Sequence, residues 1–482
     1  MATREEYDAI VIGASKAAVF FSPTLAQAGW RTALIEREYL GGVCVNVGCT
    51  PTKTMVASAR VAEFARRASE YGVQTGPVTV DMAAVRQRKR DVVSLISAIP
   101  KFLIDATEGL DLVMGEAVFI DAKSVEVRME DGSVRQLTAD RVFINTGARP
   151  SKPPIPGLDS VPSLDSTSIM ELDTVPDHLV ILGGGYIGLE FGQMFRRFGS
   201  RVTIVNRGKQ LLRREDPDVA EEVAKILRED GIEVLLESEA IKAAQTGSDQ
   251  IELTVKTPEG ERVLTGSHLL VATGRVPNTE RLNLEAAGVR MDGRGYIEVN
   301  ERLETNVPGI YAFGDVTPGP AHTHKAFDDQ RILRTNLTTS GDRTTEGRVV
   351  PYTIFIDPQL GRIGLTETEA RAQGKNIRVA KSAMDYPTPT RARELGETRG
   401  FMKVVIDADT DRILGAAILA VEGGEMMSIL QVAMMGDLPY TAIRDAVFTH
   451  PTLAEMLADL FTFADMAMEA AARSAAAAPA KG

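Results

Sequence analysis

The fold of this chain is constrained most by a pattern that occurs twice. In each copy, an apolar strand is followed by a glycine turn, a helix and a second strand. The first copy begins with the apolar run Tyr7–Gly13, and the second begins with His178–Gly183. The distance from the turn glycine to the end of the second strand is the same in both copies, 36 − 13 = 23 and 206 − 183 = 23 residues. Equal spacing predicts two mononucleotide-binding βαβ units, each on a parallel sheet.

Two further apolar strands close on a Thr-Gly pair, and they lie where each βαβ unit would end. We therefore expect the residues of these pairs, Thr146, Gly147 and Gly274, to border the two nucleotide sites. Residues 151–162 contain four prolines, which suit neither a helix nor a central strand. This segment is predicted to separate the two units.

The charge balance and the apolar pattern limit the kinds of molecule that we expect this chain to bind. With 54 basic and 66 acidic side chains, the 482 residues carry a formal charge of −12, which repels a polyanion, so we expect small molecules rather than nucleic acid as partners. No apolar run approaches the roughly 18 residues of a membrane span, and no basic segment followed by an apolar stretch opens the sequence. A cytoplasmic protein without a membrane partner is expected.

The turn of the second copy matches the G-x-G-x-x-G pattern through Gly183, Gly185 and Gly188, between a strand and a helix. The first glycine permits a tight turn, the second lets the backbone approach a pyrophosphate, and the third allows close helix packing. A simple glycine turn is the alternative, but this context favours a dinucleotide site.

The residues after the second strand of this unit indicate which dinucleotide binds. An acid at position 206 would accept a hydrogen bond from the ribose of NADH, whereas Asn206, with Arg207 and Lys209 beside it, suits the 2′-phosphate of NADPH. NADPH is predicted as the preferred coenzyme, with NADH as the second choice. The alternative is that both cations simply belong to a solvated loop.

The turn of the first copy keeps only part of the same pattern. Gly13 retains the first position, Ala18 is an accepted substitute at the third, and Ser15 at the second places a side chain where a pyrophosphate would touch the backbone. Pro23 is expected to bend the following helix or end it early. Glu36 stands where an adenosine ribose would bind, so we predict a second nucleotide here.

The only two cysteines, Cys44 and Cys49, lie five positions apart. On a regular helix this spacing gives a rise of about 7.5 Å, beyond the usual Cα separation of a disulfide, so pairing requires a break, which Gly48 could provide. Thr50 and Pro51 have the preferences of an N-cap and a first helical residue, and a helix end next to Cys49 would favour its thiolate. A redox-active pair is favoured. Inert buried thiols and a metal site are the alternatives, although zinc needs four ligands and no further cysteine exists.

The segment around the cysteines, GGVCVNVGCTPTK at residues 41–53, resembles the active-site signature of the FAD-dependent pyridine nucleotide-disulfide oxidoreductases, which include dihydrolipoamide dehydrogenase, glutathione reductase and mercuric reductase. Two later segments are similar to motifs of the same family, TNVPGIYAFGD at residues 305–315 and THPTLAE at residues 449–455. The similarity extends over about residues 5–465.

This resemblance implies an α/β fold with two Rossmann-like dinucleotide-binding domains, one for FAD and one for NAD(P)H, and a C-terminal α+β dimerisation domain. About 150 residues per domain also suggest three domains. The expected segments are residues 1–150 and 276–347 for the two parts of the FAD-binding domain, 151–275 for NAD(P)H binding, 348–465 for dimerisation, and 466–482 for an Ala-rich disordered tail.

By position, the resemblance implies that Cys44 is the interchange thiol that attacks the substrate and that Cys49 is the charge-transfer thiol beside the flavin. Lys53 would lie near flavin N5, paired with Glu190 of the NAD(P)H unit. Four further residues are implied to contact the flavin or gate its nicotinamide side: Gly42 in the signature, Asp315 at the ribityl chain, His324 at the start of a helix facing the pyrimidine edge, and Tyr186 as the gate.

His450, one of five histidines, falls in the last of these motifs. A single histidine is more often structural, but the resemblance implies a base that the partner subunit supplies to deprotonate the interchange thiol, with Glu455 fixing its tautomer. A site shared in this way implies an obligate homodimer.

The resemblance implies that electrons pass from NADPH through FAD to a Cys44–Cys49 disulfide and then to an acceptor. Mercuric reductases add a C-terminal pair of adjacent cysteines and usually an N-terminal metal-binding domain. Neither is found in this sequence, so efficient mercury detoxification is not expected, and the two cysteines alone predict no metal site. The C-terminal half is most similar to mercuric-reductase-like flavoproteins without these extensions, some of which respond to reactive chlorine or reduce hypothiocyanous acid. We expect the acceptor to be a small thiol-reactive oxidant, a disulfide or a soft metal ion.

Two alternatives accompany this function. The first is disulfide reduction of the dihydrolipoamide dehydrogenase or glutathione reductase type, although Asn206 argues against the former. The irregular first turn motivates the second, a flavin-poor regulatory or binding protein that keeps the fold without turnover.

Overall fold

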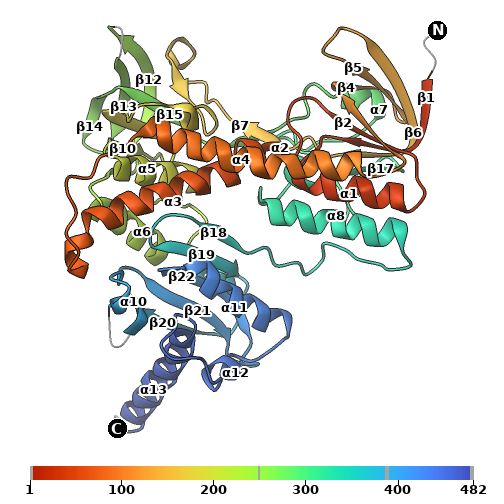
Figure 1. Ribbon diagram of the computed structural model, residues 1–482. Helices are drawn as coiled ribbons and strands as arrows, with labels where there is room; N and C mark the ends of the chain where they lie inside the picture. Colours follow the sequence, from red (N-terminus) through yellow and green to blue (C-terminus); the bar gives the residue numbers. More distant parts are fainter. Residues whose placement is uncertain (1–3, 248–249, 386–389, 478–482) are drawn as a thin grey trace.

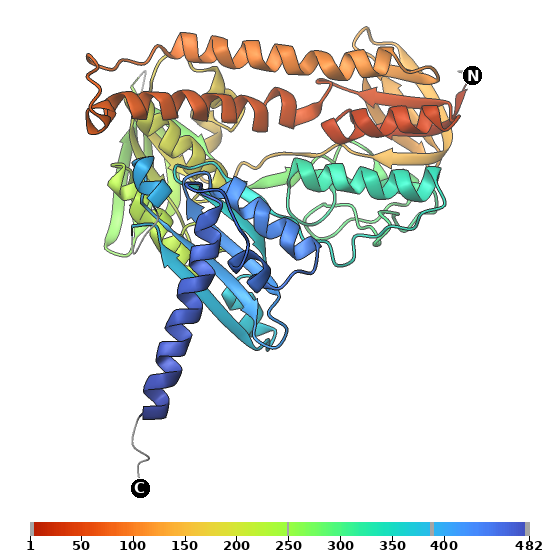
Figure 2. The same cartoon turned by 60° about the horizontal axis from the view of Figure 1, so that its bottom comes forward.

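The computed structural model describes residues 4–247, 250–385 and 390–477. Each of the two nucleotide units and the C-terminal part has its own sheet. Two long antiparallel helices, α3 (Cys49–Arg66) and α4 (Met82–Asp105), lie side by side and reach from the first unit to the second (Figures 1 and 2). The segment that carries both cysteines therefore bridges the two nucleotide units.

The first unit is built on a seven-stranded sheet with the order β3-β2-β1-β6-β5-β4, and β17 also pairs with β6. Apolar residues of β1 are buried on both faces of the sheet, which explains why they do not alternate with polar ones. The strands are β1 (Arg4–Ile12), β2 (Thr32–Glu36), β3 (Leu110–Met114), β4 (Glu116–Asp121), β5 (Ser124–Arg128), β6 (Val134–Ile144) and β17 (Ile310–Ala312). Its helices are α1 (Lys16–Gln27), α2 (Gly42–Asn46), α7 (Leu284–Ala287) and α8 (Thr323–Thr338).

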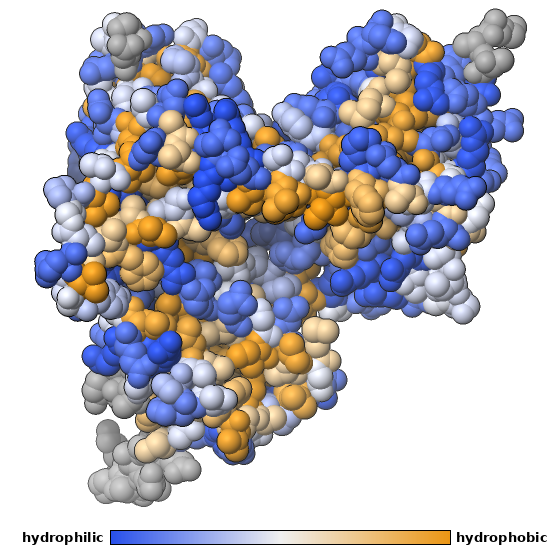
Figure 3. All heavy atoms as spheres, in the orientation of Figure 1, coloured by the Kyte–Doolittle hydropathy of each residue, from blue (hydrophilic) through white to orange (hydrophobic). Residues whose placement is uncertain are grey.

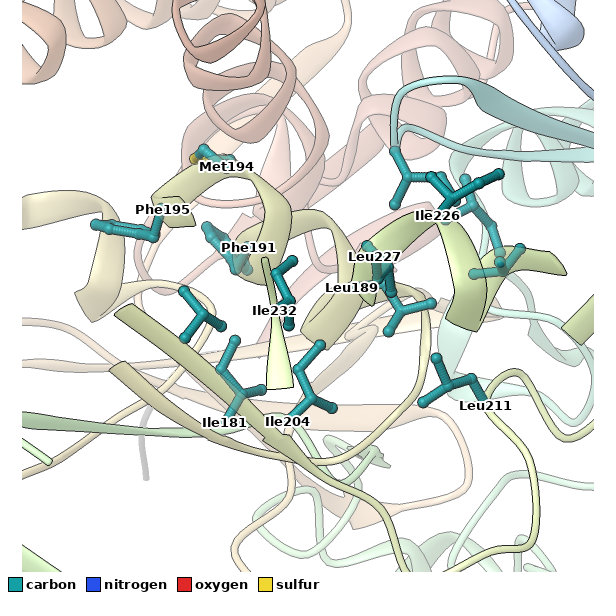
Figure 4. Close-up of a cluster of buried hydrophobic side chains, with 14 of the residues drawn as sticks. Ile181, Leu189, Phe191, Met194, Phe195, Ile204, Leu211, Ile226, Leu227 and Ile232 are labelled. Carbon is teal, nitrogen blue, oxygen red and sulfur yellow. The ribbon is translucent and has the colours of Figure 1, made fainter. Parts of the chain in front are cut away.

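The second unit has a five-stranded parallel sheet with the order β11-β10-β9-β15-β8. Apolar side chains of the sheet, including Ile181 and Ile204, face those of its two helices (Figure 4). The sheet strands and helices are β8 (Ser163–Leu164), β9 (His178–Leu182), β10 (Arg201–Val205), β11 (Glu233–Leu235), β15 (His268–Val271), α5 (Tyr186–Phe198) and α6 (Pro217–Glu229). Smaller antiparallel sheets flank it, formed by β7 (Ala148–Pro150) with β16 (Arg275–Pro277) and by β12 (Glu239–Thr246), β13 (Gln250–Thr257) and β14 (Gly260–Gly266).

The C-terminal part is an antiparallel sheet with the order β18-β19-β22-β21-β20, packed against helices. Its strands are β18 (Tyr352–Ile354), β19 (Gln359–Gly364), β20 (Ile377–Ala383), β21 (Phe401–Asp407) and β22 (Ile413–Ala420). Its helices are α9 (Glu367–Ala372), α10 (Thr390–Glu394), α11 (Gly423–Met435), α12 (Tyr440–Arg444) and α13 (Glu455–Ala477). Within the described ranges, no helix has the length and apolar character needed to cross a membrane.

The repeat read from the sequence is confirmed by the strands that follow each turn. β2 spans the predicted Thr32–Glu36, and β10 ends at Val205, one residue before the predicted end. The proline-rich segment 151–162 contains only a short 3-10 turn, η2 (Leu158–Ser160).

The structure contradicts two local expectations, an early end of α1 at Pro23 and a disordered tail. Pro23 does not end α1 early, because the helix continues to Gln27 with Phe21 and Leu25 buried on either side of the proline. Tertiary packing therefore outweighs the lost backbone hydrogen bond. The tail predicted to be disordered from position 466 is helical as far as Ala477, because alanine has the highest helix propensity. Residues 478–482 lie outside the described ranges.

Candidate active site

The first nucleotide turn, between β1 and α1, is tight. Gly13 has a φ of +99°, and a Cβ atom there would lie 2.5 Å from the carbonyl oxygen of Asn145. The Ala14 N–H donates to Glu36 Oε2 over 2.7 Å, which ties the turn to the end of β2. Ala18 is fully buried, so an alanine fits the third position of the pattern here.

Ser15 uses its hydroxyl within the turn. It is the N-cap of α1, where its Oγ accepts a hydrogen bond from the Ala18 N–H over 3.4 Å, and it donates to Asn145 Oδ1. The side chain expected to crowd a pyrophosphate is thus held by two contacts with the protein. Its extended backbone, with φ −61° and ψ 167°, is close to that of Gly185 in the second turn, with φ −87° and ψ 172°.

Glu36, predicted to bind a ribose, also organises the backbone around it. Its Oε1 accepts hydrogen bonds from the Arg37 and Glu38 N–H groups over 2.8 and 2.7 Å. These donors hold the carboxylate at the edge of a pocket that it helps to line. The pocket runs from this point towards Cys44, and its walls include most of the predicted flavin contacts: Gly13, Ser15, Glu36, Gly42, Thr146, Gly147 and Asp315.

Glycine is required at position 42 for space. It has a φ of +63°, and a Cβ atom there would lie 2.9 Å from Ser15 Cα, so the start of α2 packs directly on the start of α1. On the opposite wall, the Thr146 hydroxyl donates to the Asn278 carbonyl over 2.8 Å, and the Asn278 N–H donates to the Gly147 carbonyl over 2.9 Å. Both walls of the pocket are therefore fixed by backbone contacts.

Asp315 shows that the pocket suits a flavin nucleotide. Burial raises the pKa of its carboxyl, an effect that the charges of Arg275 and Lys325 oppose. No hydrogen bond from the described residues reaches this carboxyl, which lies in the short helix η4 (Gly314–Val316) and lines the pocket. The carboxyl is partly exposed within the pocket, where it can accept hydrogen bonds from the hydroxyls of a sugar alcohol. The residues present therefore fit FAD.

The cysteines lie on either side of a helix break. α2 ends at Asn46 and α3 begins at Cys49, with Gly48 as its N-cap. The predicted break at Gly48 is confirmed. The predicted N-cap at Thr50 was wrong, because the Gly48 carbonyl already accepts the Thr52 N–H over 3.0 Å and so starts the helix earlier.

Both cysteines are free thiols. The interaction between their two sulfurs raises the pKa of Cys44 and lowers the pKa of Cys49. Thr323, whose Oγ1 lies 3.6 Å from Cys49 Sγ, and the Lys53 ammonium lower the pKa of Cys49 further. The N-terminus of α3 adds a favourable dipole, so the thiolate is favoured at Cys49 over Cys44.

Lys53 and Glu190 form an ion pair that joins the two nucleotide units. Lys53 Nζ, on α3, lies 2.6 Å from Glu190 Oε2, on α5, and the Glu190 side chain is only 3% exposed. The other carboxylate oxygen of Glu190 accepts the Phe355 N–H over 2.9 Å, and Lys53 Nζ lies 4.8 Å from the centre of the Phe355 ring. The structure therefore brings together the two residues that the sequence predicted to pair.

The second nucleotide turn is tight at two of its three glycines. Gly183 has a φ of +121°, and a Cβ atom there would clash with the carbonyl oxygen of Ala272. At Gly188 a Cβ atom would clash with the carbonyl oxygen of Gly183 itself, whereas at Gly185 no atom lies within 4 Å. Gly274, with a φ of +139°, follows β15 on the facing loop.

Asn206 is occupied by its own loop. Its Nδ2 donates to the carbonyl oxygens of Gly208 and Gln210 over 3.0 and 2.8 Å. Arg207 and Lys209 project from this loop as exposed cations and form no ion pair with the described residues. The loop thus presents two unpaired positive charges next to the dinucleotide turn.

Sequence reasoning missed an aromatic stack beside Tyr186. The His322 ring lies 6.2 Å from the Tyr186 ring, 5.6 Å from that of Tyr352 and 5.2 Å from that of His324. Burial lowers the pKa of His322 to about 4, so this ring is neutral. His324 lies in the first turn of α8, one residue after the helix begins, and its Nε2 hydrogen-bonds with the Pro351 carbonyl over 2.6 Å. Two histidines at alternate positions were the only sequence signal.

His450 and Glu455 form the predicted pair, since His450 Nδ1 lies 3.0 Å from Glu455 Oε1. The His450 side chain is 73% exposed, and no hydrogen bond or ion pair within the described residues joins it to a cysteine of the same chain. The other ring nitrogen is therefore available to a group outside this subunit.

The cysteines have no companions for a metal ion. Across the part of the chain that the structure describes, no group of three or more His, Cys, Asp or Glu side chains is arranged to hold one.

Family models match nearly the whole chain. The model described as pyridine nucleotide-disulphide oxidoreductase matches residues 7–329, and the model of the dimerisation domain of the same family matches residues 350–461. Among curated proteins, the chain is 39% identical over 461 residues to the probable pyridine nucleotide-disulfide oxidoreductase RclA of Escherichia coli, covering 95% of this chain and 99% of the relative.

Other similar proteins are named for different activities. The chain is 34% identical to a mercuric reductase of Bacillus cereus, covering 94% of this chain and 70% of that protein, and 32% identical to a dihydrolipoyl dehydrogenase of Geobacillus stearothermophilus, covering 94% of each. A solved structure, the Cu(II) complex of the HOCl-induced flavoprotein disulfide reductase RclA from Escherichia coli, superposes with a TM-score of 0.87 at 38% identity and covers 95% of this chain and 99% of that one.

Proposed function

The chain belongs to the pyridine nucleotide-disulphide oxidoreductase family, and on that basis we propose that it passes electrons from NADPH through the Cys44 and Cys49 pair to a small thiol-reactive oxidant or disulfide. Members of this family are oxidoreductases that use FAD and NAD(P)H, with two Rossmann-like domains followed by a dimerisation domain. The observation that carries the proposal is the pair of free thiols on either side of a helix break, one of which lines the flavin pocket.

FAD, when bound, supplies two-electron redox chemistry between a pyridine nucleotide and a disulfide. The β1–α1 turn would hold it, with Glu36 at one end of the pocket and Asp315 at the other. The domain assignment follows, with residues 1–150 and 276–347 binding FAD, 151–275 binding the coenzyme and 348–465 forming the dimerisation domain.

Cys44 is the nucleophile towards the acceptor. The Cys44 thiolate attacks one sulfur of a disulfide acceptor, a mixed disulfide forms, and the first acceptor thiolate leaves and takes up a proton. The Cys49 thiolate then attacks the Cys44 sulfur, releases the second acceptor thiolate and closes the Cys44–Cys49 disulfide. Two electrons from NADPH return this disulfide to the dithiol. In total, one NADPH and one proton reduce one acceptor disulfide to two thiols.

Cys44 needs a base, because its interaction with the Cys49 sulfur raises its pKa. The partner's His450, oriented by the partner's Glu455, removes this proton in a homodimer. Its exposed ring and the carboxylate 3.0 Å from Nδ1 support this role.

Apolar side chains gather on the surface of the C-terminal part and of α4 (Figure 3), and Val432, Met435 and Phe102 are 68%, 78% and 70% exposed. Patches of this kind mark interfaces between proteins.

NADPH binds at the second turn, with the 2′-phosphate next to Arg207 and Lys209. These cations are exposed and unpaired in the described structure, which is the state a phosphate partner requires. Tyr186 gates the nicotinamide, and the Lys53–Glu190 pair orients the flavin side of the site. A dithiol centre maintained by NADPH suits a reducing compartment, so we assign the protein to the cytoplasm.

The acceptor class follows from the relatives. RclA is described as an HOCl-induced flavoprotein disulfide reductase, and others are mercuric reductases, so thiol-reactive oxidants and soft metal ions are the candidates. Only two cysteines serve this chain, which favours an oxidant or disulfide over a metal ion that must be passed between thiols.

The test is an anaerobic stopped-flow experiment on the purified flavoprotein with disulfide, hypothiocyanous acid, Hg(II), lipoamide and oxidised glutathione as acceptors. Cys49→Ser should abolish disulfide reduction and leave the bleaching of the flavin by NADPH. His450→Ala should slow the acceptor half-reaction at least about tenfold with little effect on bleaching. Turnover of a disulfide by Cys49→Ser, or equal slowing of both half-reactions in His450→Ala, would contradict the proposal.

A further inference from the structure

Lys16 is a cation in an unfavourable place. It is the first residue of α1, directly after the N-cap Ser15, where the helix dipole already presents partial positive charge and a lysine is disfavoured. Its side chain is exposed, and no ion pair or hydrogen bond with the described residues offsets this repulsion. A residue that is locally unfavourable and has no compensating contact is a candidate for a functional role.

Lys16 lines the same pocket as Cys44. Ser15 forms a parallel bridge with Gly41, and the Gly41 N–H donates to the Ala14 carbonyl over 2.8 Å, so the starts of α1 and α2 are joined. Lys16 follows this junction as the first residue of α1, and Cys44 follows it within α2. Both residues line the same pocket. The interaction with the Cys49 sulfur raises the pKa of Cys44 most, and the positive charge of Lys16 opposes this effect.

A cation in this position acts on a thiol reaction in two ways. It stabilises the thiolate that attacks the acceptor, and it attracts an acceptor that is itself an anion. Small oxidants such as hypothiocyanite carry a negative charge near neutral pH, as do disulfides that bear carboxylates. The chain as a whole has a formal charge of −12 and would otherwise repel them.

We propose that Lys16 is the anion-binding residue of the acceptor site and makes Cys44 selective for small anionic oxidants and disulfides over neutral ones. This inference rests on the proposed function, because it concerns the acceptor that Cys44 reduces. The competing role for the same side chain is to pair with a phosphate of the flavin nucleotide, whose pocket it shares.

The test compares the NADPH-reduced wild type with Lys16→Gln, Lys16→Arg and the control Lys256→Gln. Lys256 is an exposed lysine on β13, in a sheet that contributes nothing to the pocket, so its variant makes the same charge change elsewhere. The acceptors are dithiobis(nitrobenzoate), a dianion, and dithiodipyridine, which is neutral. Second-order rate constants are measured at low and high salt, and the flavin content of each variant is read from its absorbance spectrum.

Lys16→Gln should react roughly tenfold more slowly with the dianion at low salt and within about twofold of wild type with the neutral disulfide. The difference should shrink at high salt. Lys16→Arg should recover most of the rate with the dianion, and Lys256→Gln should match wild type with both acceptors.

Equal slowing of both acceptors in Lys16→Gln, or no slowing, would overturn the inference. Loss of flavin from Lys16→Gln with unchanged selectivity in the remaining holoenzyme would also overturn it and assign Lys16 to the cofactor phosphate. If wild type reduces neither disulfide, the proposed function itself fails, an outcome distinct from reduction of both without selectivity.

Discussion

The two nucleotide turns have the same course but use different residues, and the comparison shows which positions of the pattern depend on local packing. Gly13 and Gly183 both have positive φ, and a Cβ atom at either would collide with the carbonyl of the neighbouring strand end. The third position differs, because Ala18 is accommodated in the first turn whereas a Cβ atom at Gly188 would strike the Gly183 carbonyl. The third glycine is required only where the helix approaches the turn this closely.

The second position teaches a different lesson. Gly185 has open space around it and leaves α5 without a side-chain cap, whereas Ser15 caps α1 and contacts Asn145. The same extended backbone thus accepts either residue. The first turn is stabilised by the protein itself, and the second leaves its N–H groups for the ligand.

Substitution at the third position of the two turns should have the largest effect. In Gly188→Ala the new Cβ meets backbone rather than a movable side chain, so α5 must shift, and we expect NADPH affinity to fall about a hundredfold or more. The matched variant Ala18→Gly should keep FAD and lose only about 1 kcal/mol of stability. Equilibrium titration with NADPH and urea unfolding measure the two effects, and wild-type NADPH affinity in Gly188→Ala would contradict the packing argument.

The ion pair between the two units tests whether they work together. Glu190→Gln removes a buried charge that lies 2.6 Å from Lys53 Nζ, so the rate at which NADPH bleaches the flavin should fall by roughly tenfold or more. Glu229→Gln, on the exposed side of α6 where its partner Lys225 lies 3.9 Å away, is the control and should be silent. Stopped-flow absorbance provides the rate. An unchanged bleaching rate in Glu190→Gln would remove this pair from the electron path.

Charge next to the second turn should set the coenzyme preference. The double variant Arg207→Gln, Lys209→Gln should raise KM for NADPH about tenfold and leave KM for NADH nearly unchanged, because only NADPH has a 2′-phosphate to pair with these cations. Arg201→Gln, at the opposite end of β10, is the matched control. An equal increase in KM for NADPH and NADH would show that the loop acts through its shape rather than its charge.

The smallest effect should come from the cap of the first turn. Ser15→Ala loses the N-cap of α1 and the contact with Asn145 and should cost about 1 kcal/mol of unfolding free energy. Thr366→Ala, which removes the cap of α9, gives a reference of similar size. Urea unfolding measures both. Tighter FAD binding in Ser15→Gly would support the sequence-based prediction that the Ser15 side chain crowds the pyrophosphate.

Elements that depend on local pattern could be predicted from the sequence. The apolar runs gave β1 and β9, the equal spacing gave the two βαβ units, and the cysteine signature located the break before Cys49. Features that depend on tertiary contacts could not be predicted in this way. The continuation of α1 past Pro23 depends on buried neighbours, and the stack of His322 on Tyr352 joins segments whose sequences show no relation.

The central claim is that Cys49 is the thiolate beside the flavin and Cys44 the thiol that meets the acceptor. Anaerobic titration of the purified protein with NADPH, followed by absorbance, tests it most directly. We expect a long-wavelength thiolate–flavin band in wild type that persists as pH falls below the ordinary thiol range, because the pKa of Cys49 is lowered. The same band should survive in Cys44→Ser. A band that is lost in Cys44→Ser but retained in Cys49→Ser would contradict it.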